Sequence, residues 1–186
     1  YGSSDGLTSD LCTDQCPKGH YCPLGTVIPR ECPAGRYGST YGLQDNSCSG
    51  LCAIGHYCPT ASVKSTQIEC PAGRYGPAEG LTTEHCSLLC EKSDGERVQA
   101  SEQRTGECYA SSVCKEGYYC PSGSTSAQEK VCGGPDVYCP PGSAEPTFVT
   151  AGYYSVGSLS RPGTPPPNLQ DDRDANTRSS QQQCEP

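Results

Sequence analysis

Cysteine is the residue type in this chain with the greatest capacity for chemistry, because 16 of its 186 residues are cysteines. Three cysteine pairs have only three residues between their members, a spacing that could suggest zinc knuckles. Proline, glycine and tyrosine recur around them, however, and a junction between successive disulfide-linked modules explains the pairs more economically. We therefore expect disulfides and no metal site. The pairs are Cys12 and Cys16, Cys48 and Cys52, and Cys86 and Cys90.

The three histidines are the next candidates for catalysis or metal binding. His20 and His56 each precede a tyrosine in similar cysteine loops, and Tyr118 takes their place in a third loop. A metal ligand or general base would not exchange with tyrosine, so aromatic packing accounts for them better. His85 has no carboxylate or nucleophile in a repeated register beside it. We therefore expect no catalytic residue, no cofactor and no enzymatic activity.

The acidic residues also lack the pattern of a known site. The cluster at 171–176 resembles the start of a calcium loop but lacks its glycine and its closing glutamate. The net charge is -8, with acids and bases interspersed, which argues against nucleic acid and anionic membranes as partners. The sequence has no apolar run long enough to cross a membrane and no signal peptide, and we expect it to begin inside a mature protein.

The composition excludes an ordinary apolar core. Only 22 residues are Leu, Ile, Val or Phe, which is well below the roughly 20% of ordinary globular chains. Cysteine makes up about 9% of the chain, a level typical of disulfide scaffolds in an oxidising compartment. We therefore expect a secreted protein in which disulfides replace the missing core.

A repeat of 36 and then 38 residues organises the chain. The segment Cys-Pro-Ala-Gly-Arg-Tyr-Gly occurs identically at 32–38 and 70–76, and a second element runs from a cysteine through a glycine and an aromatic residue to another cysteine. The expected units are the end of a preceding repeat at 1–6, repeat 1 at 7–42, repeat 2 at 43–80, repeat 3 with an extra module at 81–157, a Pro- and Ser-rich linker at 158–183, and the start of a further repeat at 184–186.

Repeat 3 and the linker depart from the pattern. Aligning Cys86 and Cys90 with the earlier cysteine pairs places a charged insert at 91–113, and Thr150 stands roughly where a cysteine is expected. The linker contains three consecutive prolines and is expected to be irregular, with polyproline-like stretches. Glycans are expected on Thr164, Pro165, Pro166 and Pro167.

The disulfide pairing is a hypothesis drawn from the repeat, because sixteen cysteines allow too many connectivities for sequence alone to fix. Equal gaps of fifteen residues occur in two successive copies, and the short glycine loops can close on themselves. Each fifteen-residue loop would contribute about 3 kcal/mol. Cys12 and Cys184 are left over, with partners outside the chain. The expected pairs are Cys16–Cys22, Cys32–Cys48, Cys52–Cys58, Cys70–Cys86, Cys90–Cys108, Cys114–Cys120 and Cys132–Cys139.

These motifs together resemble the ephrin-receptor-like cysteine-rich repeats of the growth-factor-receptor superfamily, over residues 1 to about 157. The resemblance implies non-enzymatic two-stranded units stacked end to end, as in the repeats of tumour necrosis factor receptors. The expected fold is small, disulfide-rich and mostly irregular, with short β-hairpins in tandem modules that stack as an elongated rod. Long arrays of this kind are typical of large algal and protist surface proteins, including those that resemble mastigoneme subunits.

Two functions fit these expectations. The first is a secreted structural protein, a segment of a surface filament such as a mastigoneme or wall fibril, whose partners are copies of itself or other filament proteins, with glycans attached. The alternative is the ligand-binding ectodomain of a cell-surface receptor. At the N-terminal end, the first residues align with Tyr37–Leu43, so we expect Cys-Pro-Ala-Gly-Arg to precede Tyr1.

Overall fold

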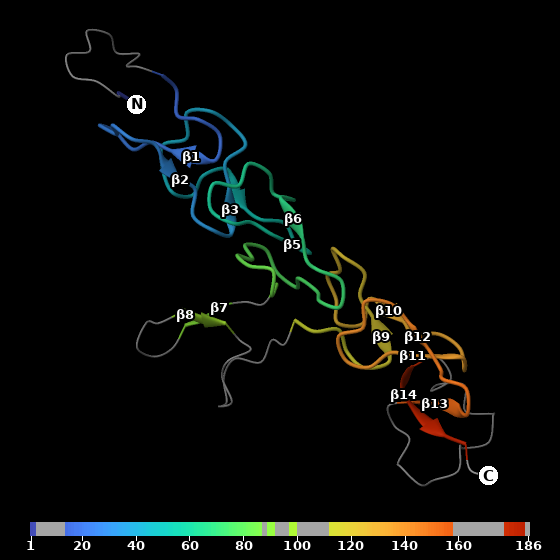
Figure 1. Cartoon of the computed structure of the whole chain (residues 1–186). Coiled ribbons are helices and arrows are strands. Elements are labelled where there is room, and N and C mark those ends of the chain that lie inside the picture. The colour runs from blue at the N-terminus through green and yellow to red at the C-terminus, as the bar shows by residue number, and fades with distance from the viewer. Residues whose placement is uncertain (3–13, 87–88, 92–96, 100–111, 158–176, 185–186) are drawn as a thin grey trace.

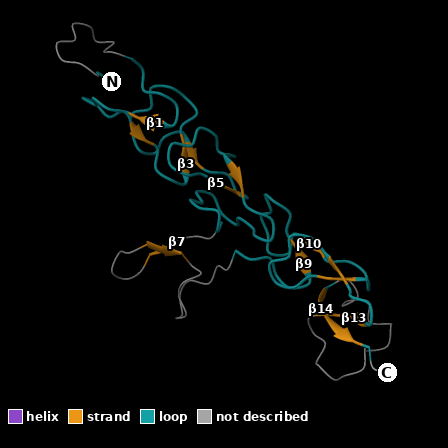
Figure 2. Cartoon of the chain, viewed as in Figure 1, coloured by secondary structure: helices purple, strands orange, loops and turns teal. Residues whose placement is uncertain are grey.

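The computed structural model describes residues 1–2, 14–86, 89–91, 97–99, 112–157 and 177–184 (Figure 1). Within these ranges the chain forms two-stranded antiparallel hairpins joined by turns and loops, and contains no helix (Figure 2). This confirms the expected disulfide-rich, mostly irregular fold with short β-hairpins. The strands are β1 His20–Tyr21, β2 Arg30–Glu31, β3 Arg36–Tyr37, β4 Gly50–Leu51, β5 His56–Tyr57, β6 Ile68–Glu69, β7 Leu89–Glu91, β8 Arg97–Gln99, β9 Tyr118–Tyr119, β10 Lys130–Val131, β11 Val137–Tyr138, β12 Thr147–Phe148, β13 Tyr153–Gly157 and β14 Arg178–Gln183.

Apart from β7 and β8, the hairpins follow one another along the molecule in chain order (Figure 1). Nothing in the described ranges is a helix of the length and hydropathy that crossing a bilayer requires.

A glycine turn and the next cysteine set the limits of each short hairpin. Gly19 has a φ of +75°, in the left-handed region that glycine adopts readily, and β1 begins directly after it. His20 then pairs with Glu31, and Tyr21 with Arg30. The cysteine after each two-residue strand enters a disulfide, and proline follows it in several copies, which prevents a longer ladder.

Six disulfides are present in the described residues, and they are six of the seven pairs that the repeat suggested. The seventh, Cys90–Cys108, includes a cysteine outside these residues. Hairpins β1–β2, β5–β6 and β9–β10 each carry a disulfide between cysteines six positions apart, and we call them short-loop hairpins. We call β3–β4 and its counterpart at Arg74 long-loop hairpins, because their cysteines are 16 positions apart. Hairpin β11–β12 has a separation of seven. The six pairs are Cys16–Cys22, Cys32–Cys48, Cys52–Cys58, Cys70–Cys86, Cys114–Cys120 and Cys132–Cys139.

The buried apolar positions are almost all disulfide cysteines. Leu81 is the one large aliphatic side chain buried in the described residues, with 2% of its surface exposed. It lies in a cluster with Cys70 and Cys86, against which Tyr57 packs. Disulfide sulfur therefore occupies the interior that aliphatic side chains fill in ordinary domains. The buried cysteines are Cys16, Cys32, Cys52, Cys58, Cys70, Cys86, Cys114, Cys120, Cys132 and Cys139.

The insertion in the third repeat occupies 87–110 rather than the expected 91–113. Arg74 forms an antiparallel bridge with Val113, just as the arginine of the preceding copy pairs with Leu51. The residues that complete the hairpin therefore resume directly after the insertion. Strands β7 and β8 belong to the inserted part and are drawn to one side of the line of hairpins (Figure 1).

Cys114, and not Cys90, therefore takes the place of Cys52. The N–H of Cys114 donates to the carbonyl oxygen of Gly73 at 3.0 Å, and the equivalent distance in the preceding copy is 2.9 Å. A cysteine at this position closes a short loop with a cysteine six positions on. Cys120 meets that requirement for Cys114, whereas no cysteine follows Cys90 at that distance. The six-position spacing to the next cysteine is therefore the physical reason why the insertion lies before Cys114 and includes Cys90.

The expected irregular linker at 158–183 is also corrected, because its last six residues are a strand. Strand β14 pairs with β13 in the longest hairpin of the described chain, from Tyr153 with Gln183 to Gly157 with Arg178. The register shifts next to Val156. β14 is made of Ser, Gln and Arg, so it has no alternation of apolar and polar residues by which sequence could reveal it.

Candidate functional site at the hairpin junctions

Five glycines occupy the same position, the third residue after a cysteine, with φ between +73° and +84°. At four of them a Cβ would lie 2.3–2.4 Å from a backbone carbonyl oxygen of the hairpin two places further along. At the fifth it would lie 3.0 Å from the Cβ of Thr177. A side chain at any of the first four positions would therefore force the neighbouring backbone to shift, and one at the fifth would crowd Thr177. The contacts are Gly19 with Ala61, Gly35 with Gly80, Gly55 with Gly123, Gly73 with Gly142, and Gly117 with Thr177.

The N–H groups of the same glycines join each hairpin to the next one. Each donates to a carbonyl oxygen at 2.7–2.9 Å. Every one of these five hairpins thus bonds to its immediate successor and contacts the hairpin after that. The bonds run from Gly19 to Gly38, Gly35 to Cys58, Gly55 to Gly76, Gly73 to Cys120, and Gly117 to Cys139.

The junction between a long-loop hairpin and the following short-loop hairpin has three backbone hydrogen bonds. In the first copy Gly35 donates to Cys58 (2.7 Å), Ala61 donates back to Cys32 (3.0 Å) and Gly38 donates to the carbonyl of Ser62 (2.8 Å). The same three bonds recur between 70–76 and 120–124, at 2.7, 2.9 and 2.8 Å. Backbone hydrogen bonds of this kind contribute about 0.5–1.5 kcal/mol each. The junctions are therefore held by the main chain rather than by apolar side chains.

Arginine supports both long-loop hairpins in the same way. The guanidinium of Arg36 donates to the carbonyl oxygen of Ser47 (3.0 Å), and that of Arg74 donates to the carbonyl of His85 (3.3 Å). Each carbonyl belongs to the residue directly before the second cysteine of the disulfide. We did not anticipate this role, although the identical arginines of the two copies were a signal for it.

Asp45 fixes the turn of the first long loop. The N–H of Ser47 donates to its Oδ1 at 2.8 Å. Hydrogen bonds from the Ser47 side chain and backbone lower the pKa of Asp45, and the nearby Arg36 charge acts in the same direction. The carboxylate is fully exposed, so it orders a surface turn and faces no enclosed site.

The histidines lie where they can make local backbone contacts. The Nδ1 atoms of His20 and His56 lie 3.1 and 3.0 Å from the carbonyl oxygens of Lys18 and Ile54, each two residues earlier. Tyr118 occupies the equivalent strand position. In the ranges that the structure describes, no three His, Cys, Asp or Glu side chains come together as a metal site would require.

Several expected residues lie outside the described ranges. They include two cysteines, the acidic cluster at 171–176 and the expected glycan acceptors. Cys90 lies in β7, and Cys184 is an exposed free thiol. The N–H of Cys184 donates to the carbonyl oxygen of Gly152 at 2.8 Å, just as the N–H of Cys32, which ends the first hairpin, donates to the carbonyl oxygen of Gly19. The residues outside are Cys12, Cys108, Thr164, Pro165, Pro166 and Pro167.

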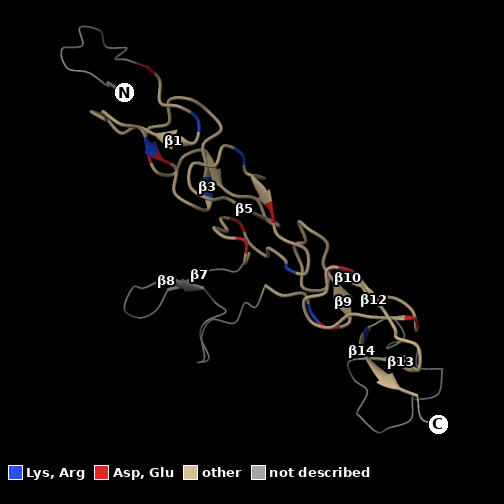
Figure 3. Cartoon of the chain, viewed as in Figure 1, with Lys and Arg blue, Asp and Glu red and all other residues tan. Residues whose placement is uncertain are grey.

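The described surface carries both signs of charge along its length, with acidic and basic side chains interspersed (Figure 3). Two lysines lie over tyrosine rings, Lys18 over Tyr41 at 5.4 Å and Lys130 over Tyr119 at 5.9 Å from the ring centre. Such exposed contacts contribute about 0.5–1 kcal/mol. They cover tyrosines that have no apolar core to enter.

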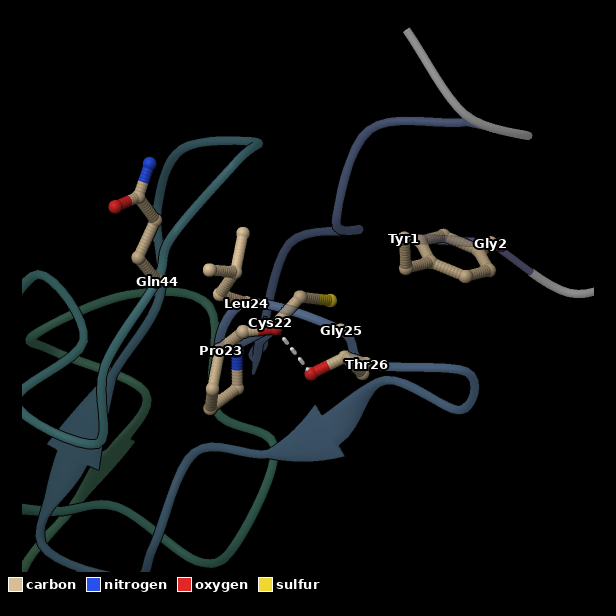
Figure 4. Close-up of a pocket in the computed structure, with 8 residues that line it drawn as sticks. All are labelled: Tyr1, Gly2, Cys22, Pro23, Leu24, Gly25, Thr26 and Gln44. Atoms are coloured by element: carbon tan, nitrogen blue, oxygen red, sulfur yellow. Dashed lines mark hydrogen bonds between the residues drawn. The ribbon is translucent and has the colours of Figure 1, made fainter. Parts of the chain in front are cut away.

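A hollow of about 520 Å³ lies at the N-terminal end of the array (Figure 4). It is bordered by the turn that follows β1, in which the Thr26 hydroxyl donates to the carbonyl of Pro23, and by the first two residues of the chain. Leu24 is fully exposed beside it. The lining residues are Tyr1, Gly2, Cys22, Pro23, Leu24, Gly25, Thr26 and Gln44.

No protein-family model matches the sequence, and no curated protein matches it.

Proposed function

We propose that this chain is part of a non-enzymatic extracellular structural protein, a segment of a surface filament such as a mastigoneme or wall fibril. The disulfide-rich fold is of the type found in extracellular proteins. The expected resemblance to ephrin-receptor-like repeats belongs to the same proposal. Copies of the chain, or other filament proteins, are the partners, and glycans cover the proline-rich segment.

The observation that supports this proposal most is the pair of contacts made by each of the five glycines at the junctions, which we call the junction glycines. They are Gly19, Gly35, Gly55, Gly73 and Gly117. A hairpin that contacts both of the next two cannot bend at one junction without disturbing the other, so such an array resists bending as a rod does. Repeat proteins held by contacts between neighbours are quasi-one-dimensional and suit extended assemblies. Disulfides at most 16 positions apart add resistance to local unfolding.

The rod itself is tested by small-angle X-ray scattering on the oxidised chain. A compact protein of 186 residues would have a radius of gyration of about 16 Å. We expect a clearly larger value and a distance distribution with the long tail of a rod. A radius near the compact value would contradict the proposal. Nonreduced peptide mapping of the same sample should recover the six disulfides.

The filament role is tested on native material by electron microscopy with antibodies raised against the oxidised chain. We expect labels at regular axial intervals along fibres. Labels spread over a cell membrane, together with a membrane span and a cytoplasmic kinase in the parent transcript, would support the receptor ectodomain instead. The scattering and the labelling can fail separately, so the shape and the assembly are judged independently.

A further inference from the structure

Two junctions show how a Cys-Pro-Ala-Gly-Arg-Tyr-Gly segment docks on the turn that follows the first strand of a short-loop hairpin. Segment 32–38 lies on turn 58–62, and segment 70–76 lies on turn 120–124, each through the three backbone hydrogen bonds described above. The turns themselves are alike, with sequences Cys-Pro-Thr-Ala-Ser and Cys-Pro-Ser-Gly-Ser. The geometry is therefore repeated and not particular to one junction.

The turn Cys22–Thr26, with the sequence Cys-Pro-Leu-Gly-Thr, is a third turn of this type, and the described residues make only part of its bonding. Gly2 donates to the carbonyl of Thr26 at 3.1 Å, which corresponds to the last of the three bonds. The amino group of Tyr1 donates to the carbonyl of Asp14 at 2.9 Å, as the N–H of Tyr75 does to Ser112. Tyr1 and Gly2 thus occupy the positions that the final tyrosine and glycine have in a docked segment.

The other two bonds of this third junction have no counterpart in the described residues. The carbonyl oxygen of Cys22 corresponds to the acceptor on Cys58, and the N–H of Gly25 corresponds to the donor on Ala61, and neither has a partner there. Gly25 also has no described atom within 4 Å of a built Cβ. The hollow of Figure 4 lies beside these two groups.

We infer that the turn Cys22–Thr26 is a docking site for a Cys-Pro-Ala-Gly-Arg segment that runs in line into Tyr1. The glycine N–H of that segment donates to Cys22, and Gly25 donates to the carbonyl of its cysteine. A second copy of this chain is not the occupant, because its own segments 32–38 and 70–76 are already docked. This inference goes beyond the filament proposal and does not depend on it.

The glycine of the segment is its specificity determinant. The glycine at this position in both docked segments has a positive φ and lies against a carbonyl oxygen of the hairpin two places further along. In the third junction that carbonyl belongs to Gly42, which also has no described atom within 4 Å of a built Cβ. Replacing the segment's glycine by alanine adds one methyl group, leaves the N–H in place and should prevent docking.

The test compares three oxidised proteins, namely the present chain, the chain extended before Tyr1 by Cys-Pro-Ala-Gly-Arg, and the chain extended by Cys-Pro-Ala-Ala-Arg. Amide hydrogen exchange is measured at Gly25. We expect exchange to slow by about tenfold or more in the first extension and to change little in the second. The Gly123 amide, which donates to Cys70 at 2.9 Å, is the internal reference and should be the same in all three.

Three outcomes would overturn the inference. Equal exchange at Gly25 in both extended proteins would show that the glycine does not direct docking. Concentration-independent protection in the present chain would mean that its own residues already fill the site. Protection that rises with concentration would identify a second copy as the occupant. The alanine extension retains the added cysteine, so an effect of that cysteine alone appears in both extensions.

Discussion

Replacing Gly35 with alanine should weaken the array far more than replacing Gly42, although the two glycines lie in the same hairpin with φ values of +82° and +75°. A Cβ at position 35 would lie 2.4 Å from the carbonyl oxygen of Gly80. A Cβ at position 42 would meet no described atom within 4 Å. The comparison therefore separates backbone strain, which both variants share, from the close contact at the junction.

The expected magnitudes follow from these geometries. Alanine in the left-handed region costs about 1–2 kcal/mol, and the smaller entropy of the unfolded chain offsets about 0.4–1 kcal/mol of this. Gly42→Ala should therefore lower the free energy of unfolding by about 0.5–1 kcal/mol. Gly35→Ala adds an overpacking term of about 1–3 kcal/mol, giving a total of about 1.5–4 kcal/mol. The shift needed to relieve the contact also disturbs the Gly35 bond to Cys58 and the Cys52 bond to Gly35.

Urea unfolding under nonreducing conditions measures the difference. The chain has 12 tyrosines and no tryptophan, so tyrosine fluorescence and near-ultraviolet circular dichroism are the probes. Mass spectrometry of alkylated samples should verify that the disulfides are intact in both variants. Equal losses of stability would refute the reasoning, because they would mean that only the φ value, and not the contact with Gly80, requires glycine at position 35.

Three further changes have defined outcomes. Ala61→Gly should raise the free energy of unfolding by about 0.5–1 kcal/mol in thermal denaturation, since Ala61 has a φ of +60° where related turns have glycine. Leu81→Ala should lower it by about 2–5 kcal/mol in urea, whereas Leu24→Ala, at a fully exposed site, should change it little. Ser47→Ala should raise the pKa of Asp45 in a carboxyl NMR titration. The same carboxylate should stabilise the fold above its unfolded pKa and lose that effect as the pH falls through its lower folded pKa.

The cysteine spacing was sufficient to predict the fold class and six disulfide pairs, because loop lengths repeat in the sequence. The position of the insertion was missed, since both Ser-Leu-Leu-Cys at 87–90 and Ser-Ser-Val-Cys at 111–114 fit the repeat, and the absence of a cysteine six positions after Cys90 was overlooked. The hydrogen bond of Cys114 to Gly73 and the bridge between Arg74 and Val113 distinguish them in the structure. The contacts between hairpins two places apart were also missed. They join backbone atoms, and the glycine that permits such a contact looks in sequence like any turn glycine.

The direction of the junction bonds has a consequence for biosynthesis. Each disulfide in the described residues closes within 16 positions, so a hairpin can oxidise soon after its cysteines enter an oxidising compartment. Its junction glycine must wait longer, because Gly19 bonds to Gly38 and contacts Ala61, both of which are made later. Folding can therefore proceed behind the growing end of the chain, with the two newest hairpins still incomplete. Contacts this local favour rapid folding, and they keep each nascent cysteine close to its correct partner.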